Sequence, residues 1–210
     1  MIAVHQNLEE RLRRPLPGLP AQLRMMPVPP PPGQKTYTEV GDDCLQGAVL
    51  ALLYPRGGKT HLIFIRRPQT VVHHKGQISF PGGHVEAGET RVQAAVREAQ
   101  EEVGLIPETA RVLGALTPLY IPPSGYCIYP FVAVTDSTPR FVPEPEEVDE
   151  ILEIPVAHLL DENNARQETW TFEIGPREVP FYAFGPHKIW GATAMVLAEL
   201  LEIFRSVEKG

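Results

Sequence analysis

Two long apolar segments, residues 46–54 and 60–66, are separated only by the stretch Pro55-Arg56-Gly57-Gly58-Lys59. Each has the length and composition of a strand that is buried on both faces, and the glycine-rich stretch between them favours a hairpin. Such a pair requires a sheet whose two faces are both covered by other elements. Further β-strand patterns, which would extend that sheet, occur at residues 111–119, 126–135, 148–153, 169–174 and 179–184.

Two other segments have helical periodicity, residues 90–103 and 192–207. In the second, apolar side chains recur at helical spacing from Ala194 to Phe204. One helix on each face is the simplest way to cover a sheet on both sides. The sequence therefore predicts an α/β (α+β) fold with a mixed central sheet.

The first of these helices is well bounded and acidic. Thr90 and Gln93 have the spacing of a capping box, and Gly104 is a natural C-terminal stop. We expect one apolar face toward the core and an acidic face opposite to it, with these members: Val92, Val96, Ala99 and Val103 on the first, and Glu98, Glu101 and Glu102 on the second. Three neighbouring carboxylates repel one another unless a cation lies among them, and oxygen-only ligands suit Mg²⁺ or Mn²⁺. Both ions are commonly shared with substrate phosphates, so the pattern indicates phosphate chemistry.

Composition narrows the possible partners and the location. The 210 residues carry a net charge of -7, which argues against a broad surface for nucleic acid. No run of apolar residues is long enough to span a membrane, and the N-terminus lacks the apolar region of a signal peptide. Cys44 and Cys127 could form one bridge, but we interpret both as packing residues of a cytoplasmic protein.

The first 35 residues differ from the rest of the chain. Eight of the eighteen residues from Pro15 to Pro32 are proline, which predicts a stiff, extended connector after a short helix at residues 8–12. We expect residues 1–35 to form an arm that packs on the domain or on a second subunit, which would give a homodimer. A docking motif for another protein is the alternative. The body of the protein is expected at residues 36–210.

The acidic helix belongs to a longer pattern. Gly83 is followed after five residues by Glu89 and after seven more by the run Arg97-Glu98-Ala99-Gln100-Glu101-Glu102-Val103-Gly104-Leu105. This resembles the complete signature of the Nudix hydrolases. The resemblance implies the Nudix α/β/α sandwich and hydrolysis of a diphosphate linked to a further moiety, with Mg²⁺ or Mn²⁺ as cofactor.

The resemblance also implies roles for individual residues. The metal would be held by Glu98, Glu101, Glu102 and a main-chain carbonyl near Gly83, while Arg97 and Glu89 would form a structural ion pair. Family members differ in the carboxylate that acts as general base. We favour Glu101 and keep as reserve a later acidic cluster, which could equally be a solvated loop: Glu144, Glu146 and Glu147.

A motif upstream of the box resembles that of the coenzyme A pyrophosphatase branch. It comprises Arg67-Pro68 and the run from His74 to Gly83, and the chain departs from the branch pattern at Pro68 and at Val72, where an arginine is usual. Segments at residues 123–133, 147–160 and 189–194 also resemble the branch. We expect substrate phosphates to be bound by some of these basic residues: Arg66, Arg67, His74 and Lys75.

The branch implies cleavage of coenzyme A, or of a derivative, to 3′,5′-adenosine diphosphate and 4′-phosphopantetheine. Two alternatives stay open. One is a Nudix hydrolase for another nucleoside diphosphate derivative, such as ADP-ribose, a dinucleotide cofactor or an oxidised nucleotide, and Val72 is the feature that favours it. The other is a Nudix domain that binds a ligand without turnover, and it is disfavoured because all three box glutamates are present.

Overall fold

The computed structural model describes residues 2–30, 44–68, 75–122 and 124–208. Its helices are α1 (Ile2–Leu12), α2 (Leu19–Gln22), α3 (Arg91–Val103), α4 (Val156–Leu160) and α5 (Gly191–Glu208), with 3₁₀ turns η1 (Leu23–Met25), η2 (Pro107–Thr109) and η3 (Glu162–Asn164). Its strands are β1 (Leu45–Arg56), β2 (Lys59–Arg66), β3 (Ile78–Ser79), β4 (Gly82–His84), β5 (Arg111–Ala115), β6 (Leu119–Ile121), β7 (Tyr126–Val134), β8 (Glu150–Pro155), β9 (Ala165–Phe172), β10 (Gly175–Phe184) and β11 (His187–Trp190). The predicted α/β class with a mixed sheet is confirmed.

The β1–β2 hairpin is the centre of the larger sheet. Its turn is Gly57-Gly58, where both residues have positive φ, and Leu53 pairs with Leu62 in the antiparallel register. Successive residues of β1 point to opposite faces, so Leu52 joins one core cluster and Leu53 joins the other. The residues of both clusters are buried, which explains why the two segments are largely apolar.

The larger sheet has mixed strand directions. Its main order is β3-β2-β1-β7-β5, with β4 paired to β1, β6 to β7 and β8 to β2. The β1–β7 pair is parallel, and it brings Gln46 opposite Cys127 at the start of both strands. All other pairs in this sheet are antiparallel. The N-terminal ends of β1 and β7 therefore lie at the same end of the sheet as the C-terminal end of β2.

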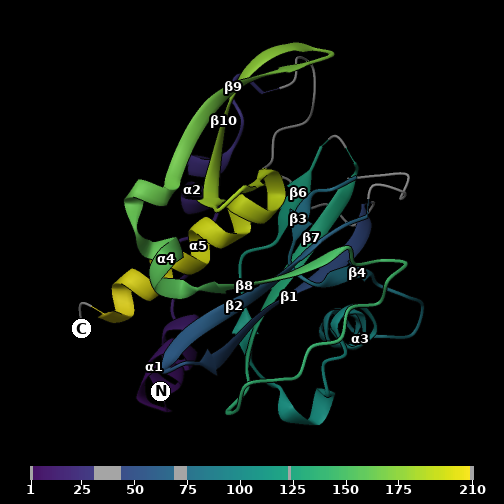
Figure 1. Ribbon diagram of the computed structural model, residues 1–210, viewed down its shortest axis with the longest axis vertical. Helices are drawn as coiled ribbons and strands as arrows, with labels where there is room; N and C mark the ends of the chain where they lie inside the picture. Colours follow the sequence, from purple (N-terminus) through teal and green to yellow (C-terminus); the bar gives the residue numbers. More distant parts are fainter. Residues whose placement is uncertain (1, 31–43, 69–74, 123, 209–210) are drawn as a thin grey trace.

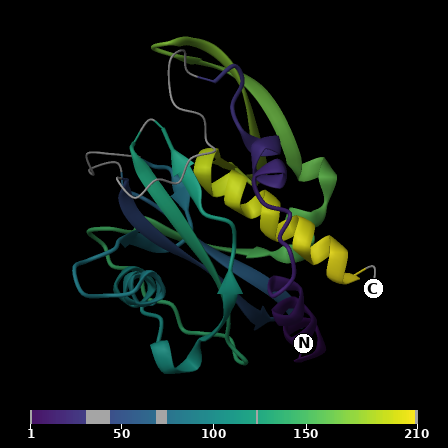
Figure 2. The same cartoon turned by 180° about the vertical axis from the view of Figure 1, so that it is seen from behind.

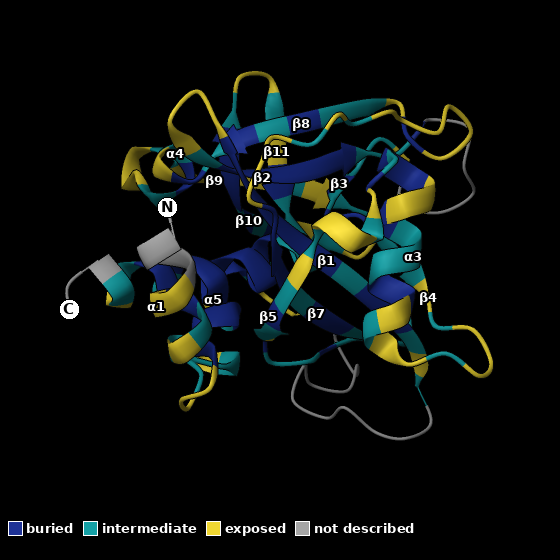
Figure 3. Ribbon diagram, turned by 90° about the horizontal axis from the view of Figure 1, so that it is seen from below, coloured by how far each residue is buried: buried dark blue, intermediate teal, exposed yellow. Residues whose placement is uncertain are grey.

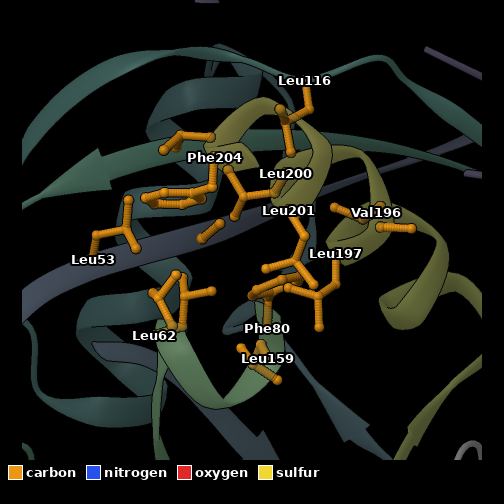
Figure 4. Packing of buried hydrophobic residues seen from close by; sticks show 14 of the residues in the cluster. Leu53, Leu62, Phe80, Leu116, Leu159, Val196, Leu197, Leu200, Leu201 and Phe204 are labelled. Atoms are coloured by element: carbon orange, nitrogen blue, oxygen red, sulfur yellow. The ribbon is translucent and has the colours of Figure 1, made fainter. Parts of the chain in front are cut away.

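Helices cover both faces of this sheet. In Figures 1 and 2, α3 lies against one face, and α5 with α1 lies against the other. Figure 3 shows that the strands between them are largely buried. The larger cluster packs α5 against β1 and β2, as Figure 4 shows for Leu53, Leu62, Leu201 and Phe204. The predicted α/β/α arrangement is thus present.

A second, three-stranded sheet projects from the body. Its order is β11-β10-β9, and both pairs are antiparallel. In Figure 1 it extends upward beyond the N-terminal end of α5. The two strands expected at residues 169–174 and 179–184 are longer than predicted, and β11, with only four residues, gave too short a pattern to be recognised.

The N-terminal segment packs on the domain. Leu8, Leu12 and Met25 belong to the same core cluster as α5. The expectation of a wholly extended connector is wrong, because α2 and η1 form two helical turns within the proline-rich part. Pro20 is tolerated there since it lies in the first turn of α2, where a backbone N–H has no helical partner.

The interpretation of the two cysteines as packing residues is also wrong. Cys44 and Cys127 form a disulfide, with a Cα–Cα distance of 5.7 Å. The parallel pairing of β1 with β7 brings the two residues together across 83 positions of sequence. Sequence alone left this open, because two cysteines form no recognisable framework. Among the helices of the described residues, none is long and apolar enough to cross a membrane.

A buried carboxylate joins the N-terminal segment to the last helix. Glu199 of α5 is fully buried and accepts hydrogen bonds from Gly18 N (3.0 Å), Gln22 Nε2 (2.9 Å), Thr117 N (3.1 Å) and Thr117 Oγ1 (2.7 Å). Because each carboxylate oxygen has two donors, the desolvation of the charge is offset. The same residue thereby fixes α2 and the loop before β6 against α5.

Glu199→Gln places an amide NH₂ group against donors and should destabilise the protein by about 2 kcal/mol or more, because buried donors lose their acceptor. Urea denaturation would measure the loss, and limited proteolysis should show earlier cleavage within the first 30 residues. Glu202→Gln, on the exposed side of the same helix, is the matched control and should change stability little. Equal midpoints for both variants would contradict this account of the network.

Candidate metal centre

The helix that carries the acidic residues is bounded as predicted. Thr90 Oγ1 accepts a hydrogen bond from Gln93 N (3.3 Å), and Gln93 Oε1 accepts one from Thr90 N (2.8 Å), which completes the capping box. At the other end Gly104 adopts the left-handed conformation with φ of 67° and donates its N–H to Gln100 O. These caps fix where α3 begins and ends, and so fix which way its carboxylates point.

The predicted division of α3 into an apolar and an acidic face is wrong in part. Glu102 is only 2% exposed and lies on the face that packs against the sheet, together with Ala94, Ala95, Ala99 and Val103. Glu98 has a side-chain exposure of 14%, whereas that of Glu101 is 53%. The small alanine side chains let the helix approach the sheet closely. Glu102 contacts a polar backbone group at this interface.

That backbone group belongs to the glycine pair of β4. Gly82 N donates to Glu102 Oε2 at 2.8 Å, and Gly82 and Gly83 pair with Val49 and Ala48 of β1. A Cβ on Gly83 would lie 2.4 Å from Glu98 Cδ, and one on Gly82 would lie 2.3 Å from Ala48 O. The contact at Gly82 is with backbone and requires glycine, whereas the neighbour at Gly83 is the movable end of the Glu98 side chain.

Arg97 organises the other carboxylates of the helix. It makes a bidentate pair with Glu89, with Nη2–Oε1 at 2.9 Å and Nε–Oε2 at 3.1 Å, which is the ion pair that the resemblance implies. Its Nη1 also lies 2.9 Å from Glu98 Oε1 and 2.8 Å from Glu101 Oε2. Glu101 is therefore turned toward Arg97 and the solvent, and it does not join the buried carboxylates.

The carboxylate that joins them comes from the reserve cluster. Glu98, Glu102 and Glu147 each offer an oxygen within 4.8 Å of the others, as a metal site requires. The loop that carries Glu147 is anchored to the end of α3, since Val142 N and Glu144 N donate to Val103 O and Glu102 O, both at 3.0 Å. The unpaired carbonyls at the helix end thus determine where this loop lies. Glu144 and Glu146 are exposed and do not enter the cluster.

The electrostatics of the cluster favour a cation. Burial is the main cause that raises the pKa of Glu102 to about 8, and the hydrogen bond from Gly82 and the charge of Arg67 oppose the rise. Burial likewise raises the pKa of Glu98, although Arg97 acts against it. In contrast, the hydrogen bonds from Arg97 lower the pKa of Glu89. Glu89 is therefore charged in its ion pair, whereas burial outweighs the contact of Arg97 with Glu98, and Glu102 has no direct cationic partner among the described residues.

The expected phosphate-binding residues separate into distinct environments. Arg66 is paired with Asp149 and Glu150, at 2.8 and 3.2 Å, so much of its charge is already neutralised. Arg67 is near enough to Glu102 to affect its pKa, and its Nε is buried without a hydrogen-bond partner among the described residues. Lys75 is exposed, and His74 lies outside the described residues. Arg67 is thus the basic residue that faces the carboxylate cluster.

Sequence reasoning undervalued Glu147. Three glutamates interleaved with Pro143 and Pro145 are typical of a solvated loop, and nothing in their spacing distinguishes one from the next. The usable signal was Val148, an apolar residue directly after the acidic run, which is 3% exposed and packs in the cluster of α3. A buried residue at this position fixes its neighbour Glu147 beside the helix.

The raised pKa of Glu102 predicts a stability cost that the metal removes. In the metal-free protein, the unfolded chain loses this proton near pH 4.5 while the folded chain retains it to about pH 8. Stability should therefore fall between about pH 5 and pH 8, since the unfolded state binds fewer protons. Glu102→Gln should remove this fall and raise stability in chelator by on the order of 2 kcal/mol at neutral pH.

Thermal denaturation in chelator and in Mg²⁺, at several pH values, would check this. Added Mg²⁺ should stabilise the wild type more than the variant, because only the wild type retains all three carboxylates. A variant that loses stability with rising pH as steeply as the wild type would exclude Glu102 as the cause.

Comparisons with known proteins identify the family of the chain. A model of the NUDIX domain matches residues 45–174. The chain is 33% identical over 201 residues to the mitochondrial coenzyme A diphosphatase NUDT8 of Homo sapiens, covering 93% of this chain and 77% of that protein. It is 31% identical over 176 residues to the uncharacterized Nudix hydrolase NudL of Photorhabdus laumondii, covering 83% of this chain and 90% of that protein.

Among solved structures, a Nudix hydrolase of M. smegmatis, RenU, shares the fold. It superposes with a TM-score of 0.52 at 20% identity and covers 79% of this chain and 96% of that chain. The likeness to this structure agrees with the fold, while the domain model and the relatives confirm the predicted family: the chain belongs to the Nudix family.

Proposed function

We propose that the protein is a metal-dependent diphosphatase that cleaves coenzyme A or a derivative to 3′,5′-adenosine diphosphate and 4′-phosphopantetheine. The observation that carries the proposal is the convergence of Glu98, Glu102 and Glu147 beside Gly83. The relatives support the substrate, since one that matches over nearly the whole chain is named a coenzyme A diphosphatase.

The cluster fits a hard divalent cation, Mg²⁺ or Mn²⁺. All three side chains offer oxygen, two of them are shielded from water, and no arginine or lysine of the described residues neutralises Glu102 by direct contact. When bound, the cation neutralises charge on the diphosphate and makes the attacking water more acidic. Glu98, Glu102, Glu147 and the carbonyl region of Gly83 are the groups that would hold it.

The remaining chemistry is assigned to this chain's own residues. Arg67 supplies a guanidinium that binds and orients phosphate oxygens, and it does so without the carboxylate partners that occupy Arg66. Glu147 is exposed at the edge of the cluster, where it can accept a proton from water that approaches the phosphorus atom. Glu101, which we favoured as general base, serves instead to position Arg97.

A panel of diphosphates tests the substrate. With Mg²⁺ or Mn²⁺ present, we expect coenzyme A to be cleaved with the highest kcat/KM, and chromatography should show 3′,5′-adenosine diphosphate as one product. The comparison set is ADP-ribose, NADH, a diadenosine polyphosphate and oxidised dGTP. A clear preference for one of these would support the metal site but show that coenzyme A is not the main substrate. The absence of any turnover would favour a ligand-sensing domain.

Two glutamates of one loop test the base. Glu147→Gln should lower kcat by roughly 10²-fold or more, the range expected when a positioned general base or metal ligand is lost. Glu146→Gln, one residue away and outside the cluster, is the matched control and should stay within about twofold of the wild type by the same reasoning. If Glu101→Gln lost more activity than Glu147→Gln, the assignment of Glu147 would be wrong.

Location and assembly stay predictions. A cytoplasmic protein and a homodimer are the expectations from sequence. The disulfide between Cys44 and Cys127 bears on the first, because reducing compartments keep most protein thiols unpaired. Fractionation of cells and analytical ultracentrifugation address the two questions separately.

A further inference from the structure

One face of the projecting three-stranded sheet combines aromatic and basic side chains. The pairing of β9 with β10 and of β10 with β11 aligns Trp170 with Arg177, Phe181 with Trp190, and Ala183 with Lys188. Since paired residues point to the same side, one face carries the following set, here called the arm face: Arg166, Glu168, Trp170, Phe172, Arg177, Val179, Phe181, Ala183, Lys188 and Trp190. The opposite face carries Tyr182 and Ile189, which belong to the core cluster of α5.

The aromatic side chains of the arm face form a connected group. Trp170 lies edge-to-face with Trp190 at 5.0 Å between centroids, and Phe172 lies 6.1 Å from Trp190. Phe181 is buried beneath them, whereas Trp170, Phe172 and Trp190 are only partly buried. Among these rings, Phe181 alone is buried enough to form part of the hydrophobic core of this small sheet. The three partly exposed rings leave aromatic surface free for a ligand.

The charge of the arm face is opposite to that of the whole chain. It carries three cations, Arg166, Arg177 and Lys188, against the single carboxylate of Glu168, in a chain with a net charge of -7. Lys188 Nζ lies 5.6 Å from the centroid of Trp170 and 5.0 Å from that of Phe181. Arg177 is 6% exposed and its Nη1 donates to Pro29 O, while its Nε has no hydrogen-bond partner among the described residues, so Lys188 is the accessible cation beside the rings. Cations beside aromatic rings suit a ligand that is both planar and anionic.

The base of the projecting sheet contacts the part of the body that carries the candidate metal centre, through β11 and through His187 on the face opposite to the arm face. β11 lies beside β3, which precedes the glycine pair Gly82-Gly83 by two residues. His187 Nε2 is 3.5 Å from Glu150 Oε1, and Glu150 also contacts Arg66. Glu150 follows Glu147 by three residues, and Trp190 follows His187 by three, so each step spans at most about 11 Å. The base of the projecting sheet is thereby connected to the segment that carries Glu147.

From this placement we propose that the arm face binds the phosphorylated adenosine end of the substrate, with the base against Trp170 and Trp190 and the phosphate at Lys188. The inference rests on the proposed function, because it takes its ligand from the products of coenzyme A cleavage. It extends that function by assigning substrate specificity to β9, β10 and β11, which are separate from the acidic helix and its glycine pair. The phosphate would replace Glu168 as the partner of Lys188, whose ion pair with Glu168 is exposed.

Fluorescence gives a direct test, since Trp170 and Trp190 are the two tryptophans of the chain. Adenosine 3′,5′-bisphosphate should quench them saturably, AMP should bind more weakly, and 4′-phosphopantetheine should have no saturable effect. A free tryptophan derivative corrects for absorption by adenine. In Trp170→Leu the bisphosphate should bind about tenfold more weakly, the range of one lost stacking contact.

Lys188→Gln tests the phosphate without disturbing the buried part of the sheet. The preference of the wild type for the bisphosphate over AMP should fall at least severalfold in this variant, and KM for coenzyme A should rise while kcat changes little. Lys59→Gln, an exposed lysine of the β1–β2 hairpin, is the matched control and should leave both constants unchanged.

The outcomes separate this inference from the proposed function. If coenzyme A is hydrolysed but neither quenching nor the Lys188 effect is found, the proposed function stands and the arm face is not the subsite. If the bisphosphate quenches saturably but coenzyme A is not hydrolysed, the subsite stands and the substrate is wrong. Saturable quenching by 4′-phosphopantetheine, or a homodimer in ultracentrifugation that dissociates in Trp170→Leu, would overturn the assignment of the arm face to adenosine.

Discussion

The close approach of α3 to the backbone of Gly82-Gly83 is the constraint on which the site depends. It removes Glu98 and Glu102 from water, and it exists because three alanines of the helix and the two glycines leave almost no side-chain volume between the elements. The capping box and Gly104 prevent the helix from shifting, and Arg97 ties it to Glu89 and to His84 O. The result is two carboxylates held where they are unfavourable without a cation.

That arrangement places function in conflict with stability. A buried carboxylate with a raised pKa costs free energy at neutral pH, and the surrounding core has to offset the cost. The offset is visible in the hairpin of β1 and β2, which is buried along nearly its whole length, and in α5, whose apolar face fills the opposite side of the sheet. The disulfide at the start of β1 and β7 further constrains the strand next to the glycine pair.

Much of this could be predicted from sequence because it is local. The central hairpin, the caps of the acidic helix, the last helix and the Nudix signature all lie within continuous stretches of about two dozen residues or fewer, and each is confirmed. The errors concern contacts between distant segments. The burial of Glu102, the pairing of Cys44 with Cys127, and the selection of Glu147 from three similar glutamates arise from tertiary packing, which leaves no periodic pattern in the sequence. The folding of α2 within the proline-rich segment likewise depends on its contact with α5 through Glu199.

The segment from Val142 to Glu150 connects these parts of the molecule. Its first residues satisfy the carbonyls at the end of α3, Glu147 enters the carboxylate cluster, and Asp149 N donates to Arg66 O while its side chain pairs with the same arginine. Glu150 then meets both Arg66 and His187 at the base of the projecting sheet. One short segment therefore positions a carboxylate of the metal centre, occupies Arg66 so that Arg67 is the arginine left facing the cluster, and contacts the strand that carries Lys188 and Trp190. Because these contacts share one backbone, a ligand that spans the metal centre and the arm face would bind two sites whose separation is fixed by the protein before the ligand arrives.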